Sequence, residues 1–105
     1  MMDNREIPWF KNAADRVENY YSKLGADRLA TLILKYLSHV ETYVREKEIV
    51  EFVCGQTVVD RDDTVLATLE LLLDDNYLVR DTSSGERRYR FRYDIMRRWW
   101  RINKG

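Results

Sequence analysis

Catalysis needs titratable or nucleophilic side chains that converge, and this chain of 105 residues has few of them. Its only histidine, His39, lies near the end of a predicted helix, where a surface position is more common than a general base. Its only cysteine, Cys54, follows apolar Phe52 and Val53, which is more typical of a small buried residue than of a reactive thiol. Nothing in the sequence brings the cysteine and the histidine together for thiol catalysis.

The acidic stretch DRDD, residues 60–63, lies where a helix is predicted to begin. Capping and the helix dipole explain these carboxylates better than a metal site does. The stretch lacks the alternating oxygen ligands and the glycine of a calcium loop, and one cysteine with one histidine cannot build a structural zinc site. The four glycines are isolated, so no glycine-rich phosphate loop is present. We therefore expect a chain that is not an enzyme and that has no cofactor or metal.

The stretch GERRYRFRYDIMRRWWRINKG, residues 85–105, interleaves arginines with aromatic residues. Such interleaving is compatible with a nucleic-acid contact and equally with a half-buried hairpin whose arginines face water. Residues 86–105 carry eight basic and two acidic side chains, a formal charge of +6 within a chain of zero net charge. The candidate contacts to phosphate or to a protein partner are Arg87, Arg88, Arg90, Arg92, Arg97, Arg98 and Arg101.

The helix predicted before this stretch has the opposite charge. Residues 60–75 carry six acidic side chains and one arginine, a formal charge of −5. The outward positions of that helix offer no Arg, Lys, Asn or Gln that could read a base edge in the major groove. DNA binding is therefore the alternative function, in the form of a weak and salt-sensitive contact through the hairpin arginines.

Apolar periodicity predicts the elements that must position these side chains in a single domain. We expect residues 1–11 to be irregular and helices to cover roughly 12–24, 27–40, 45–55 and 62–75, with a last short helix capped by Asp94. Residues 42–44 predict a short strand, and 76–81 with 86–94 predict a β-hairpin around the turn TSSG. The expected fold class is mainly α with a small β-hairpin, that is, α+β.

The aromatic residues divide between the core and a candidate interface. Alternation places Tyr89, Phe91 and Tyr93 on the inward face of the second hairpin strand. Adjacent tryptophans at 99 and 100 differ by about 100° on a helix, so one of the two is expected to face another surface. The terminal helices then either cover each other or meet a partner. The candidate interface residues are Trp9, Phe10, Trp99, Trp100, Asp62, Asp63 and Glu70.

Residues 26–102 resemble the winged-helix domains found C-terminal to P-loop ATPases of the AAA and STAND type. The resemblance is carried by VLATLELLLDDNYLVRD, residues 65–81, and by RYRFRYDIMRRWW, residues 88–100. In such domains a leucine-rich third helix leads into the first strand of the wing, and a Y-x-F strand runs directly into a basic helix that bears tryptophan. The resemblance implies a winged helix-turn-helix at 26–102, preceded by an extension with a helix at 1–25 and followed by a tail at 103–105.

The chain departs from those ATPases because it has no phosphate loop, so it is expected to be a piece of a larger protein or a stand-alone relative. The resemblance implies an accessory domain that contacts DNA in some members and packs on an ATPase core or on partners in others. We expect a regulatory or interaction module whose partner is another protein, another domain of its parent or a second copy in a homodimer. The absence of a secretory signal and of a long apolar run predicts a soluble cytoplasmic domain with no membrane contact.

Overall fold

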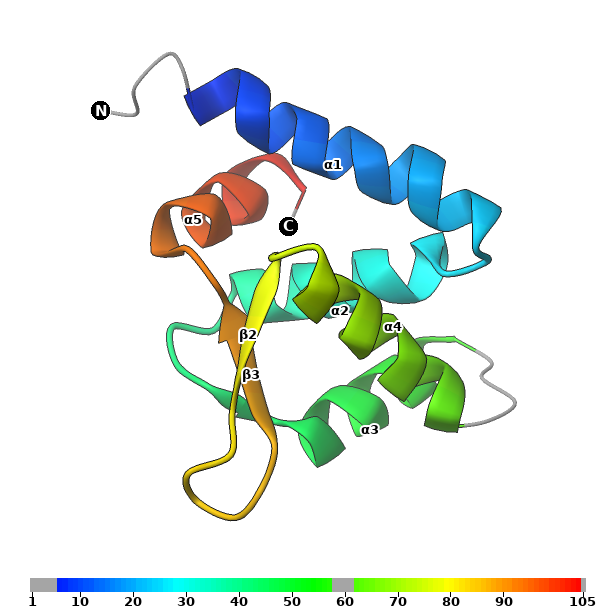
Figure 1. Ribbon diagram of the computed structural model, residues 1–105, viewed down its shortest axis with the longest axis vertical. Helices are drawn as coiled ribbons and strands as arrows, with labels where there is room; N and C mark the ends of the chain where they lie inside the picture. Colours follow the sequence, from blue (N-terminus) through cyan, green and yellow to red (C-terminus); the bar gives the residue numbers. More distant parts are fainter. Residues whose placement is uncertain (1–5, 58–61, 105) are drawn as a thin grey trace.

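The computed structural model describes residues 6–57 and 62–104. The predicted class, mainly helical with a small antiparallel sheet, is confirmed. None of the described helices combines the length and the apolar character that a membrane span requires. In chain order the elements are α1 (Glu6–Lys23), α2 (Asp27–Ser38), β1 (Val44–Arg45), α3 (Glu46–Gln56), α4 (Asp62–Asp74), β2 (Leu78–Asp81), β3 (Arg88–Phe91) and α5 (Asp94–Asn103), as Figure 1 shows.

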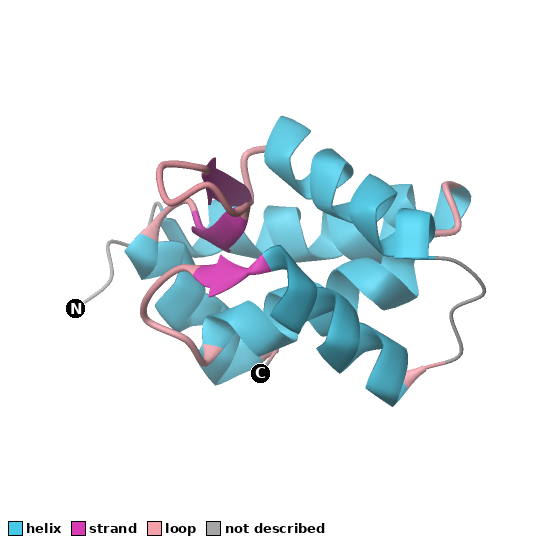
Figure 2. Cartoon of the chain, turned by 90° about the horizontal axis from the view of Figure 1, so that it is seen from below, coloured by secondary structure: helices cyan, strands magenta, loops and turns pink. Residues whose placement is uncertain are grey.

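The sheet has the strand order β1-β3-β2, with β3 in the centre and both neighbours antiparallel to it. Opposite residues in the ladder include Val44 with Tyr89 and Leu78 with Phe91, and all four of these side chains are buried. The predicted hairpin is therefore confirmed, although each of its strands is shorter than the sequence indicated. The strands lie in the left half of Figure 2, and their buried side chains belong to the same hydrophobic core as those of the helices.

Helix α2 is the central element, because it contacts α1, α3, α4, α5 and β3. Its buried side chains form two adjacent stripes, one of positions 29, 33 and 37 and one of positions 30, 34 and 38. Figure 1 shows α1 lying across α2 and α5 on the side away from α3. The buried residues of α2 are Leu29, Ala30, Ile33, Leu34, Leu37 and Ser38.

The first helix begins earlier than predicted, since α1 starts at Glu6 rather than near residue 12. Pro8 is compatible with this start, because the first turn of a helix has no intrahelical partner for the backbone N–H that proline lacks. Asn12 is consequently inside the helix and is not its cap. Phe10, only 1% exposed, belongs to the same core as the other helices.

Two helices end in the same backbone motif. After α1, the N–H of Ala26 donates to the carbonyl of Tyr21 and that of Gly25 to the carbonyl of Ser22, with Gly25 at φ 70°. After α4, the N–H of Tyr77 donates to Leu72 and that of Asn76 to Leu73, with Asn76 at φ 66°. Each pair of bonds forms a Schellman motif, which requires a left-handed residue that glycine or asparagine adopts most easily.

Two buried tyrosines form hydrogen bonds that connect α1 with the segment after α4. The hydroxyl of Tyr77 donates to the carbonyl of Ala13 at 2.6 Å. The hydroxyl of Tyr21 donates to the carboxylate of Asp75 at 2.7 Å, and the same carboxylate accepts from the guanidinium of Arg16 at 3.2 Å. These contacts join residues more than fifty positions apart, so they fix the place of α1 in the fold.

Burial raises the pKa of three tyrosine hydroxyls. It raises the pKa of Tyr77 to about 12. Burial, and then the hydrogen bond to Glu46, raise that of Tyr89 to about 12. The pKa of Tyr21 is also raised, first by burial and then by its hydrogen bond to Asp75. In each case the folded protein favours the neutral hydroxyl.

Replacement of Asn76 by alanine is expected to lower the free energy of unfolding by about 1 kcal/mol, because the left-handed conformation is costly for that side chain. Asn76→Gly is expected to stay within about 0.5 kcal/mol of the wild type, because glycine adopts this conformation without strain. Urea denaturation followed by circular dichroism measures both values. Equal stabilities for the two variants would contradict the conformational argument.

The free energy of unfolding is expected to fall as the pH rises from 10 to 12. Below pH 10 the tyrosines are neutral in the folded and in the unfolded chain, so their full contribution to stability is present. Above pH 10 the unfolded chain releases protons that folded Tyr77 and Tyr89 keep up to a pH of about 12. Urea denaturation across this range measures the fall. A Tyr77→Phe variant is expected to show a shallower fall, and an unchanged pH dependence would count against the assignment.

Candidate interaction site

The hairpin arginines point away from the core, and several of them are neutralised within the chain. Arg88 forms an ion pair with Asp81, whose pKa the hydrogen bond from Arg88 lowers below its usual value. The guanidinium of Arg87 lies 3.8 Å from the carboxylate of Glu46. The predicted basic surface is thus weaker than its count of arginines indicated.

Two arginines of this region lie over aromatic rings and form no ion pair with the described residues. The guanidinium of Arg90 lies 5.6 Å from the ring centre of Tyr43, which also faces Arg88 at 5.7 Å. The guanidinium of Arg92 lies 5.6 Å from the ring of Tyr93 and donates to its hydroxyl at 3.1 Å. Sequence reasoning treated Tyr43 only as a strand former, because its place opposite the arginines depends on the pairing of β1 with β3.

Arg97 was predicted as a surface contact, and this prediction is wrong. Only 4% of the residue is exposed. Its Nε donates to the carboxylate of Asp94 at 2.9 Å and its Nη1 to the carbonyl of Ser38 at 3.2 Å. The guanidinium therefore lies at the negative end of the α2 dipole, where a cation is stabilised.

Asp94 is the first residue of α5 and not its cap, contrary to the predicted role, because the N-cap position is held by Tyr93. Its carboxylate instead pairs with Arg97 and with Arg98, the latter at 2.9 Å. The hydrogen bond from Arg97 lowers the pKa of Asp94 below its usual value. Arg98 and Arg101 are exposed, and Arg101 has no ion-pair partner among the described residues.

The acidic residues predicted as an interface behave differently from one another. Glu70 pairs with Arg80 of the hairpin at 2.6 Å, so an acid of α4 and a base of β2 neutralise each other inside the domain. Asp63 is exposed on α4. Asp62 is the first residue of α4, but its side chain is outside the described part of the structure, as are Asp60 and Arg61.

Three of the four aromatic residues predicted at an interface are buried inside the chain: Phe10, Trp99 and Trp100. The two tryptophans do face different directions, as helix geometry requires. The ring of Trp99 lies 6.0 Å from Phe10 of α1, whereas Trp100 lies 5.9 Å from Phe91 and 6.0 Å from Tyr77. Both are covered because α1 supplies the second surface. The terminal helices thus cover each other.

A different set of apolar side chains is exposed, and sequence reasoning identified only one member of it. Tyr93, predicted in the core, is turned outward because the chain leaves β3 at Phe91. Its ring lies 6.0 Å from that of Trp9. We refer to the four residues as the exposed apolar set. With their exposed fractions they are Trp9 (50%), Tyr93 (43%), Ile95 (40%) and Ile102 (77%).

Two members of this set share one face of α5. Ile95 and Ile102 are seven residues apart, which is nearly two helical turns, and Arg98 lies between them on the same face. The sequence IMRRWWRI already indicated that this helix has apolar residues on more than one face. What could not be deduced is which face the rest of the chain covers.

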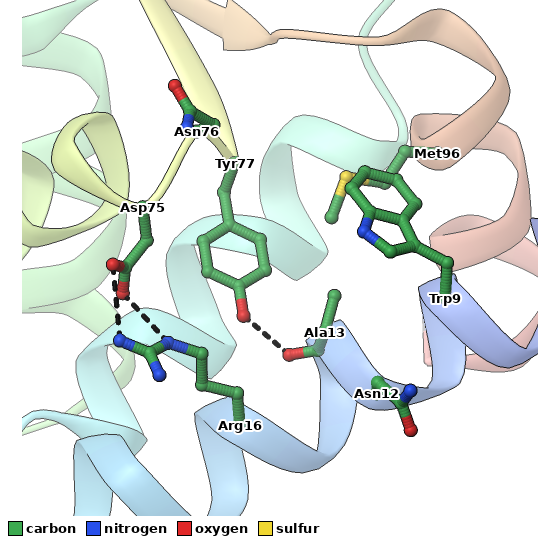
Figure 3. Close-up of a pocket in the computed structure, with 8 residues that line it drawn as sticks. All are labelled: Trp9, Asn12, Ala13, Arg16, Asp75, Asn76, Tyr77 and Met96. Atoms are coloured by element: carbon green, nitrogen blue, oxygen red, sulfur yellow. Dashed lines mark hydrogen bonds and ion pairs between the residues drawn. The ribbon is translucent and has the colours of Figure 1, made fainter.

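A pocket of about 230 Å³ lies where the first half of α1, the turn after α4 and the start of α5 meet. Figure 3 shows the ring of Tyr77 on one side of it and Trp9 with Met96 on the other, with Ala13 between them. Asn12 and Asn76 lie at its edge. No sequence signal indicated this pocket, because it is formed by three segments far apart in the chain.

His39 and Cys54, the only histidine and the only cysteine of the sequence, both lie on the surface. Cys54 was predicted to be buried, but it is exposed, whereas its neighbour Val53 on α3 is buried. His39 is exposed at the end of α2. Within residues 6–57 and 62–104, no three His, Cys, Asp or Glu side chains form a group that could hold a metal ion.

Comparisons with protein-family models, with curated proteins and with solved structures find no match for the chain.

The Arg97→Met variant is expected to lower the free energy of unfolding by about 1–3 kcal/mol, because the carbonyl of Ser38 loses its donor in a buried position. The matched variant Arg98→Met is expected to change it by less than about 0.5 kcal/mol, because the Arg98–Asp94 pair is exposed. Urea denaturation of both proteins decides the matter. Similar effects at the two positions would show that Arg97 has no special structural role.

Proposed function

We propose that this chain is a non-catalytic winged-helix module that binds another protein or another domain of its parent protein. The arrangement of elements supports the winged-helix assignment. Helices α2, α3 and α4 are followed by the β2–β3 hairpin, and β1 joins the hairpin in the order β1-β3-β2. In this assignment the hairpin is the wing, α4 is the third helix, and α1 and α5 are additions that cover α2.

The observation that carries the proposal is the exposed apolar set. Four of the six large apolar side chains that are exposed among the described residues belong to this set, and the other two are Tyr20 and Leu24. Trp9 and Tyr93 contact each other, and Ile95 and Ile102 share a face of α5 with Arg98. Aromatic residues and arginine are enriched at protein interfaces, and the acid beside this surface, Asp94, is paired with Arg98.

The charges support a protein partner over DNA. On α4, the helix that a winged helix would present to the major groove, Asp63 and Asp74 are exposed, and Glu70 is bound to Arg80. An acidic helix is repelled by phosphates. The alternative function, a wing-mediated contact to DNA, is favoured only by Arg90 and Arg92, which form no ion pair with described residues.

The protein-binding function is tested by affinity purification from the natural host with quantitative mass spectrometry. The double variant Ile95→Asp, Ile102→Asp is expected to lose a defined group of proteins that the wild type retains. Leu24→Asp is the matched control, because Leu24 is similarly exposed but directly follows the last residue of α1, whereas Trp9 lies near the start of that helix. If the double variant and the control retain the same proteins as the wild type, the proposal is wrong.

The alternative is tested by fluorescence anisotropy with labelled duplexes of two unrelated sequences at low and moderate salt. We expect no preference between sequences and a dissociation constant no better than about 10⁻⁶ M at moderate salt, as for non-specific binding. The Arg90→Glu, Arg92→Glu variant is expected to remove the residual affinity. A tight, sequence-dependent interaction would favour the DNA-binding alternative.

A further inference from the structure

The pocket between α1, the turn after α4 and the start of α5 has apolar walls. Tyr77 and Met96 are buried and form its deep part, Ala13 lies between the two walls, and the half-exposed indole of Trp9 stands at its side (Figure 3). Its volume of about 230 Å³ is below the range of roughly 300–1,000 Å³ that is usual for drug-sized ligands. The pocket therefore has room for one large side chain.

The edge of the pocket carries two carboxamides that are available for hydrogen bonding. The side chains of Asn12 and Asn76 make no hydrogen bond to the described residues. The backbone of Asn76 is fixed by the hydrogen bonds that end α4, and the backbone of Asn12 is fixed because the residue lies within helix α1. A carboxamide has both a donor and an acceptor, so it matches the N–H and the C=O of a peptide group.

The charged residues at the pocket argue against a cationic occupant. The carboxylate of Asp75 already accepts from Arg16 at 3.2 Å and from the hydroxyl of Tyr21 at 2.7 Å. An incoming lysine or arginine would find this carboxylate occupied and would meet the positive charge of Arg16. An aromatic ring, in contrast, gains edge contacts with Tyr77 and Trp9 and a contact with the thioether of Met96.

We propose that this pocket receives one aromatic side chain from a segment of the protein partner, while the backbone of that segment pairs with Asn12 and Asn76. The inference rests on the proposed function, because the occupant is part of the partner. Trp9 connects the two surfaces, since its indole lines the pocket and its ring also contacts Tyr93 of the exposed apolar set. The pocket supplies the anchor, and the exposed apolar set supplies the surrounding contact.

The proposal is tested with small peptide mimics in an NMR titration of the ¹⁵N-labelled protein. N-acetyl-phenylalaninamide carries an aromatic side chain and two amides, and we expect saturable shifts of the Trp9 indole N–H, the Asn12 and Asn76 carboxamides and the Ala13 amide. N-acetyl-lysinamide is expected to bind at least about tenfold more weakly, because the pocket offers no open carboxylate. The absence of localised shifts with the phenylalanine compound, or tighter binding of the lysine compound, would overturn the proposal.

Two variants locate the binding. Ala13→Leu fills the pocket from its middle and is expected to abolish the shifts. Asn76→Gly removes one carboxamide without backbone strain and is expected to weaken binding about fivefold, the effect of about one lost hydrogen bond. For both variants, unchanged chemical shifts of residues far from the pocket are the control that the protein is still folded. Unchanged binding in both variants would place the ligand elsewhere and overturn the proposal.

The partner-capture experiment separates this inference from the function on which it rests. If Ala13→Leu and Asn76→Gly retain the proteins that the Ile95→Asp, Ile102→Asp variant loses, the pocket proposal fails and the protein-binding function stands. If the Ile95→Asp, Ile102→Asp variant loses nothing, the protein-binding function fails and the pocket proposal fails with it.

Discussion

Helix α2 must be covered on more than one side, and the rest of the structure follows from this constraint. Leu29, Ile33 and Leu37 form one buried stripe, and the residues that follow each of them form a second one about 100° further round the helix. Helices α3 and α4 and strand β3 cover one part of the α2 surface, and α1 and α5 cover another part. Exposure of either stripe would forfeit roughly 1.5–3 kcal/mol for each large apolar side chain.

The positions of α1 and α5 are fixed by polar contacts as well as by apolar packing. Arg97 ties the start of α5 to the last carbonyl of α2, and Tyr21 and Tyr77 tie α1 to the segment after α4. Buried polar groups stabilise a fold only when they are paired, and these are paired with one another or with the backbone. The pocket and the exposed apolar set therefore lie on elements whose relative positions are defined, which is the condition for a specific binding surface.

Ion pairs within the domain reduce the electrostatic potential of its surface. A chain of zero net charge with an acidic helix and a basic hairpin could present two strong surface potentials. The fold instead pairs Arg80 with Glu70 and Arg88 with Asp81, so part of the negative and part of the positive surface potential are neutralised within the domain. Arg90 and Arg92, which form no ion pair with the described residues, lie over the rings of Tyr43 and Tyr93.

The sequence by itself determined the order of the elements, the hairpin and most inward faces, because periodicity reports the direction in which each side chain leaves its own helix or strand. It could not report what occupies that direction. Trp99 and Trp100 leave α5 in different directions, and only the presence of α1 decides that both are buried. For the same reason Arg97 is buried and Cys54 and Tyr93 are exposed, against expectation. The candidate site was therefore predicted only in part: Trp9 was named from the sequence, whereas the pocket and the two isoleucines depend on contacts between segments that only the tertiary structure brings together.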